Sequence, residues 1–139
     1  MAKGLSIKFK SYNDTVHKLL DIIKLGNELK KHDKLILKPF LSTDESKNTD
    51  KIFVEEVLAY CIKNKNPEAQ IFIAEGSDGA ETMDLFSQYG YKDLSEKYSV
   101  GLIDLNNAEI QQIEDREFLK FSQIYYPKIL LDSFIISLP

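Results

Sequence analysis

Residues 70–79 read QIFIAEGSDG, an apolar stretch that runs directly into a polar loop containing two glycines. Similar aliphatic runs occupy residues 35–37, 100–105 and 134–138. Short runs of this kind, rich in Ile, Leu and Val and bounded by turn residues, are typical of strands buried on both faces of a parallel sheet. The chain therefore contains at least four candidate strands that belong in the interior of a domain.

The segments between these strands carry the spacing of helices. Apolar side chains recur on one helical face over residues 16–23, 53–62 and 83–89, and a further short helix is expected over residues 91–98. Asn13 and Asp14 can cap the first helix, which should break near Gly26, and Thr49 is the expected N-cap of the second. This alternation predicts an α/β fold, a three-layer, Rossmann-like arrangement in which helices cover both faces of a mostly parallel sheet. We expect residues 1–139 to form one domain.

Other segments predict additions to this sheet. Residues 5–10 alternate apolar and polar side chains, the pattern of a half-buried edge strand. Residues 108–113 and 118–124 have the pattern of two strands of an antiparallel hairpin. A short helix is then expected to begin at Tyr125-Tyr126-Pro127.

Composition excludes several classes of partner. Lys and Arg number 18 against 22 Asp and Glu, which gives a net charge of −4, and Arg116 is the single arginine. We expect no nucleic-acid binding, because such proteins carry a basic patch rich in arginine. No apolar run reaches the ~20 residues that cross a membrane, and the N-terminus lacks a secretory signal. The single cysteine, Cys61, lies on the apolar face of its helix, so the sequence predicts a buried thiol in a cytoplasmic protein.

The best chemical signal lies where three predicted strands end. The carboxyl ends of parallel strands meet at one edge of a sheet, where α/β proteins bind ligands. A lysine, a serine hydroxyl and two glycines could hold a small anionic ligand there, with carboxylates acting as a base or as ligands of Mg²⁺. No separate metal site is expected. The candidate ligand-binding residues are Lys38, Glu75, Gly76, Ser77, Asp78, Gly79 and Asp104.

Two functions remain open at this point. The chain could be an enzyme, or half of one, that acts on a small anionic metabolite, although the sequence contains no complete set of nucleophile, base and orienting group. Alternatively, it could be a non-catalytic binding or assembly module. If residues 134–138 form a strand at an open edge, a twofold homodimer would cover that edge.

Several of these segments, taken in order, resemble the first half of the family catalogued as domain of unknown function 362. The resemblance spans residues 30–139. It implies an α/β domain that can work beside an iron–sulfur protein, since many relatives carry a ferredoxin-like domain. The family's strand-end motif reads Lys-Pro-Asn, whereas Phe40 follows Lys38-Pro39 here. No cofactor is evident in this chain, and with Cys61 alone any iron–sulfur cluster would have to come from a partner or a missing segment. The segments that carry the resemblance are residues 34–39, 48–50, 75–77, 90–94, 100–105 and 135–139.

Overall fold

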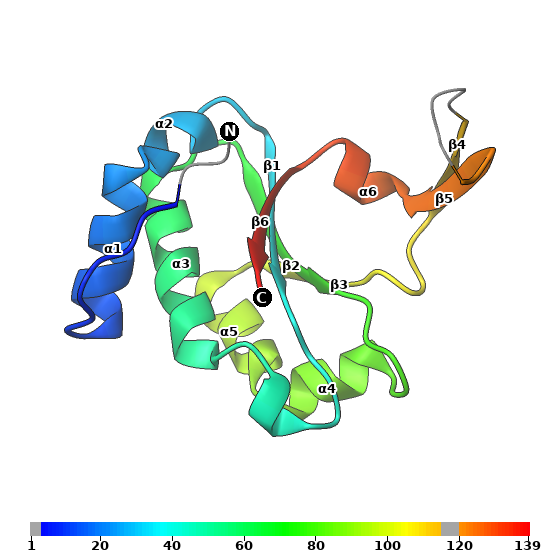
Figure 1. The fold of residues 1–139 in the computed structure, drawn as a ribbon, viewed down its shortest axis with the longest axis horizontal. Helices are drawn as coiled ribbons and strands as arrows, with labels where there is room; N and C mark the ends of the chain where they lie inside the picture. The colour runs from blue at the N-terminus through cyan, green and yellow to red at the C-terminus, as the bar shows by residue number, and fades with distance from the viewer. Residues whose placement is uncertain (1–3, 115–119) are drawn as a thin grey trace.

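The computed structural model describes residues 4–114 and 120–139 and centres on a parallel sheet of four strands (Figure 1). The strand order is β3-β2-β1-β6, and all three neighbouring pairs are parallel. A separate antiparallel hairpin, β4 (Ile110–Glu114) with β5 (Gln123–Pro127), projects away from the sheet. The predicted α/β class, mostly parallel sheet and added hairpin are confirmed. The sheet strands are β1 (Lys34–Pro39), β2 (Gln70–Glu75), β3 (Gly101–Asp104) and β6 (Phe134–Leu138).

Helices join these strands in the alternating order that the sequence predicts. The connection from β1 to β2 contains α3, the connection from β2 to β3 contains α4 and α5, and α6 precedes β6. A short 3-10 helix, η1 (Glu45–Lys47), lies between β1 and α3. The helices are α1 (Tyr12–Ile22), α2 (Leu25–Leu29), α3 (Lys51–Asn64), α4 (Thr82–Gln88), α5 (Tyr91–Tyr98) and α6 (Lys128–Leu131).

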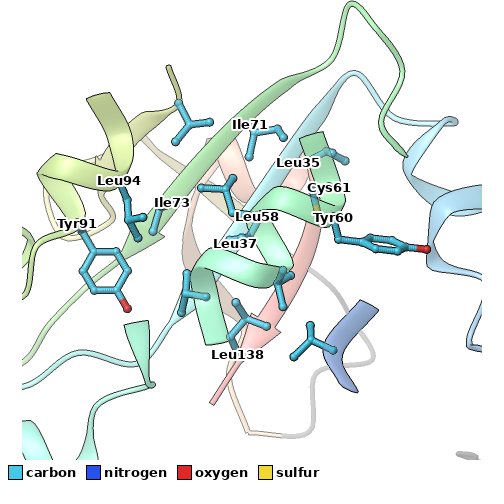
Figure 2. Close-up of a cluster of buried hydrophobic side chains, with 14 of the residues drawn as sticks. Leu35, Leu37, Leu58, Tyr60, Cys61, Ile71, Ile73, Tyr91, Leu94 and Leu138 are labelled. Atoms are coloured by element: carbon cyan, nitrogen blue, oxygen red, sulfur yellow. The ribbon is translucent and has the colours of Figure 1, made fainter. Parts of the chain in front are cut away.

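The two faces of the sheet are covered very differently. On one face, Leu35 and Ile73 pack with Leu58 of α3 and with apolar residues of α1, α2, α4 and α5, and all three are fully buried (Figure 2). Each such leucine stabilises the fold by about 1.5–3 kcal/mol. On the other face, Ile36 packs with Leu130 of α6. Helices therefore lie on both faces, but the second layer consists of one short helix and the base of the hairpin.

This asymmetry follows from the strand order. The chain moves from β1 to β2 to β3 in one direction, so crossovers of one handedness place α3, α4 and α5 on the same face. It then returns past β1 to β6, which reverses the direction and places α6 on the opposite face. The reversal makes the boundary between β1 and β6 a topological switch point, the place where open α/β sheets form a crevice.

The N-terminal part of the chain differs from the sequence prediction at two points. Residues 5–10 form no strand, because no sheet strand lies beside them, and Phe9 instead packs edge-on against Tyr12 with ring centroids 5.3 Å apart. The first helix ends at Ile22 rather than near Gly26, since Lys24 adopts a left-handed conformation with φ 59°. Gly26 therefore lies inside α2.

Two boundaries later in the chain also differ. The N-cap of α3 is Asp50, whose carboxylate accepts from the Ile52 amide at 2.7 Å, and Thr49 has another partner. Its hydroxyl donates to the Leu138 carbonyl at 2.6 Å, so Thr49 joins the β1–α3 connection to β6. The second hairpin strand runs over Gln123–Pro127 rather than residues 118–124, of which residues 118 and 119 lie outside the described residues. The register that pairs Ile110 with Pro127 places both tyrosines in β5, and the helix begins afterwards.

In the part of the chain that the structure describes, no helix combines the length and the apolarity needed to cross a membrane. The longest described helix, α3, covers Lys51–Asn64 and carries charged side chains on its exposed side. Most apolar residues of α3, among them Val54, Val57 and Leu58, are buried in the core beneath the sheet.

Candidate functional site

The carboxyl ends of β1, β2 and β3 lie side by side, as the topology requires. In the parallel register Leu37 pairs with Ile73, and Glu75 pairs with Asp104. Lys38 follows Leu37, so the polar residues that end these strands meet at one edge of the sheet. We call this group of side chains the strand-end cluster and define it by Lys38, Glu75, Gly76 and Ser77.

A half-buried ion pair lies at the centre of the strand-end cluster. The Nζ atom of Lys38 lies 2.9 Å from Oε2 of Glu75, and Oε1 of Glu75 accepts from the Gly76 amide at 3.0 Å. The Glu75 side chain is 5% exposed and that of Lys38 is 36% exposed. Both carboxylate oxygens therefore accept a hydrogen bond, while the ammonium group keeps further N–H donors. Glu75 therefore holds the Lys38 ammonium group in place.

Gly76 allows the loop after β2 to approach the end of β3. A Cβ atom at this position would lie 2.8 Å from Oδ1 of Asn106, so any larger residue would displace the Asn106 side chain. That side chain donates to the Ser77 carbonyl at 2.9 Å. Asn106 thus fixes the loop, a role that the sequence prediction missed, although Asn106-Asn107 directly after a strand is a common turn signal.

The Ser77 side chain is buried without a partner. Ser77 is 4% exposed, and its hydroxyl forms no hydrogen bond among the described residues. Its amide donates to Oγ1 of Thr82 at 3.1 Å. The loop amide is therefore occupied by the protein itself, whereas the hydroxyl is shielded from solvent and has no partner among the described residues.

The other three predicted residues lie outside the strand-end cluster. Asp78 and Gly79 are exposed, and Gly79 adopts φ 76°, the left-handed conformation that favours glycine. The Asp104 carboxylate accepts from the amide of Asn106 at 2.9 Å and from Nδ2 of Asn107 at 2.7 Å. Asp104 therefore closes the turn after β3, beside Glu75 in the register but with both oxygens in use.

A cavity of about 560 Å³ lies next to this edge, between the β1–α3 connection and the corner that joins α4 to α5. Tyr91 lines it, is 1% exposed, and its hydroxyl forms no hydrogen bond among the described residues. Burial raises the pKa of Tyr91 above its ordinary value, and the carboxylates of Asp50 and Glu75 raise this pKa further. The phenol that lines the cavity is thus neutral, and it lies close enough to the strand ends for the Glu75 carboxylate to raise its pKa. The sequence prediction did not identify Tyr91, since an isolated tyrosine in a helix carries no ligand-binding signal.

Residues of the kinds that bind metals are dispersed in the structure. Over residues 4–114 and 120–139, no group of three or more His, Cys, Asp and Glu side chains is placed to hold a metal ion. Cys61 is fully buried in α3, as predicted, and burial raises the pKa of its thiol to about 12. Such a thiol is a packing residue, because nucleophilic cysteines need a low pKa and access to solvent.

Comparison with known proteins gives one result that concerns the whole sheet. The family model described as Domain of unknown function (DUF362) matches residues 35–139, from the first residues of β1 to the end of β6. No curated protein and no solved structure matches the chain. The match covers more than half of the chain and includes every residue of the strand-end cluster and of the cavity.

Proposed function

Because the chain belongs to the DUF362 family, whose description names no reaction, we propose its function from geometry: the strand-end cluster binds a small molecule through an anionic group. The observation that carries this proposal is the buried Ser77 hydroxyl, which has no partner among the described residues. A buried hydroxyl without a partner costs about 1–3 kcal/mol, so a ligand oxygen at this position would be stabilised. The partly exposed Lys38 ammonium supplies a positive charge at the same edge of the sheet.

The position of the cluster also supports this proposal. Lys38 is paired in register with Ser137 of β6, so it lies at the switch point between β1 and β6 as well as beside β2. Crevices at such points are the usual ligand sites of open α/β sheets. The charges of Lys38 and Glu75 cancel, which favours a ligand with one anionic group over a polyanion.

An NMR titration tests this proposal at the level of single residues. Inorganic phosphate and acetate are added separately to ¹⁵N-labelled protein, and the amide signals of residues 75–79 are followed. We expect saturable shifts for one of the two anions, weakened about tenfold or more by Ser77→Ala, which removes one hydrogen bond to a charged group. Ser77→Ala removes an unpartnered hydroxyl and should leave the unfolding free energy unchanged or slightly higher.

Lys31→Met provides a matched control for the loss of positive charge. Lys31 is an exposed lysine that pairs with Glu28, before β1 and therefore at the opposite end of the strands. Its removal should leave the titration unchanged, whereas Lys38→Met should abolish it. The proposal is wrong if neither anion shifts residues 75–79, or if Ser77→Ala binds as tightly as the wild type.

A second candidate function, self-association, rests on a different observation. Among the described strands, β6 pairs only with β1, so its other edge is open, and Phe134, Ile135 and Ile136 are each only partly buried. We propose that this edge pairs with β6 of a second copy, since open apolar edges are normally covered. Light scattering should show dimers at micromolar concentration, and a monomer at high concentration would exclude this candidate.

A further inference from the structure

The cavity next to the strand-end cluster brings the beginnings of two helices together. Its lining includes Asp50 and Lys51, where α3 begins, and Gly90 and Tyr91, where α5 begins. The volume of about 560 Å³ lies within the range of roughly 300–1,000 Å³ typical of small-molecule sites. Its lining shares no residue with the strand-end cluster, so an inference about this cavity goes beyond the function proposed above.

The buried Tyr91 hydroxyl is the first sign of a ligand. The ring packs in the core beside Leu94 and Phe86, and Figure 2 shows the hydroxyl pointing away from Leu94 and Ile73. Tyr91 is 1% exposed, and its oxygen has no partner among the described residues. The protonated phenol is a hydrogen-bond donor that the described protein groups do not satisfy.

The charges at the two helix starts are the second sign. No side chain caps α5, whose N-cap is Gly90 at φ 74°. A Cβ atom on Gly90 would lie 2.8 Å from Nζ of Lys51, so this ammonium group lies against the start of α5. A cation is unfavourable at the positive end of a helix, and among the described residues Lys51 forms no ion pair. An anion between the ammonium group and the α5 amides would remove this conflict.

The start of α3 does not compete for such an anion. Oδ1 of Asp50 accepts from the Ile52 amide at 2.7 Å, and Oδ2 accepts from the Tyr12 hydroxyl at 2.7 Å. Both carboxylate oxygens are therefore engaged, and this helix start is capped. The donors of the cavity are therefore the uncapped α5 start, the Tyr91 hydroxyl, the Lys51 ammonium and the side-chain amide of Gln88.

We infer that this cavity binds the anionic oxygen group of a small molecule, a phosphate monoester or a carboxylate. The Tyr91 hydroxyl and the Lys51 ammonium donate to its oxygens, and the first amides of α5 stabilise its charge. Glu45, which also lines the cavity, is exposed. Its carboxylate favours a ligand whose remaining part carries hydrogen-bond donors and disfavours polyanions such as nucleoside triphosphates.

Two tyrosines with opposite surroundings give a sharp test. Tyr91→Phe removes the unpartnered hydroxyl and keeps the buried ring. Tyr89 lines the same cavity, but its hydroxyl donates to the Ser42 carbonyl at 3.1 Å, so Tyr89→Phe is the matched control. Inorganic phosphate and acetate are titrated separately into ¹⁵N-labelled wild type and both variants, and the amides of residues 90–93 are followed.

We expect one of the two anions to shift the amides of residues 90–93 saturably, and this anion identifies the group as phosphate or carboxylate. Tyr91→Phe should weaken its affinity about 10- to 100-fold, the effect of losing a hydrogen bond to a charged acceptor. Lys51→Gln should also weaken the affinity for this anion, and Tyr89→Phe should leave that affinity unchanged. In urea denaturation without anions, Tyr91→Phe should be as stable as the wild type or more stable.

Three results would overturn this inference: no saturable shift with either anion, equal affinity in the wild type and Tyr91→Phe, or loss of stability in Tyr91→Phe. The last would mean that the hydroxyl already has a partner within the protein. The readout also separates the two sites. Shifts confined to residues 75–79 and sensitive to Ser77→Ala would support the strand-end cluster alone, whereas shifts at residues 90–93 sensitive to Tyr91→Phe support this cavity.

Discussion

Removal of the Lys38 ammonium group is the most direct perturbation of the strand-end cluster. Lys38→Met keeps most of the aliphatic stem but leaves the 5%-exposed Glu75 carboxylate with the Gly76 amide as its remaining partner. At 2.9 Å and an effective dielectric constant of about 20, the attraction between the two charges is about 6 kcal/mol. Desolvation of the carboxylate offsets most of this attraction. Since the Lys38 side chain is 36% exposed, solvent screens the remainder, and we expect Lys38→Met to cost about 2 kcal/mol of unfolding free energy.

A double-mutant cycle with Glu75→Gln separates the ion pair from the other effects of each substitution. Urea denaturation at pH 7 should show the double variant to be more stable than the sum of the single losses implies, by about 1–2 kcal/mol. The exposed Lys31–Glu28 pair, 2.7 Å apart, is the matched control, and its coupling should be below about 0.5 kcal/mol. Losses at Lys38 and Glu75 that add within about 0.5 kcal/mol would refute the reasoning, because the two charges would then not stabilise each other.

Three further predictions concern packing and burial. Gly76→Ala should cost about 1–3 kcal/mol in thermal denaturation, because the added methyl group displaces Asn106, and an unchanged melting temperature would contradict the close approach described above. Thr49→Val should cost about 2–3 kcal/mol, because it removes the hydroxyl that donates to the Leu138 carbonyl and accepts from the Phe40 amide, and a valine variant as stable as the wild type would mean that these two bonds contribute nothing. The Cys61 thiol, with its pKa raised from 9.0 to about 12, should react with iodoacetamide at pH 8 about a thousandfold more slowly than a free thiol, as followed by mass spectrometry, and an equal rate would show that it is exposed. Because the folded state holds this proton more tightly, the associated stability is complete below pH 9.0 and is lost as the pH rises towards about 12. Cys61→Ala should remove the share of this dependence that belongs to the thiol, while the share of Tyr91, whose pKa burial also raises, remains.

The parallel core could be predicted because its signals are local. Residues 35–37 and 71–74 are aliphatic runs that only a strand with both faces covered can bury, and the structure places them in β1 and β2. The alternation of strands and helices then brings the strand ends together, so the proximity of Lys38 to Glu75 follows from topology alone. Their direct ion pair does not follow, since it depends on side-chain reach across the register.

The features that sequence reasoning missed depend on contacts between distant segments. Residues 5–10 alternate like a strand, but a strand needs a paired neighbour, and these residues pair with none of the described sheet strands. Lys24 takes a left-handed conformation that its residue type disfavours, because packing of α2 determines the chain path there. The hydroxyl of Tyr91 becomes a candidate ligand-binding group only because α5 lies against the β1–α3 connection and encloses the cavity with it.

The hydrogen bond from Thr49 to Leu138 joins residues that are far apart in sequence, as does the pairing of Leu35 with Phe134 in the sheet. Closing so long a loop is entropically costly, so β6 should pair late in folding, after β1, α3 and β2 have associated through contacts of shorter range. Glu75 and Lys38 both belong to that earlier unit. The strand-end cluster can therefore form before the crevice between β1 and β6 exists, and a ligand bound to the cluster would accelerate the docking of β6 only if it also contacts that strand.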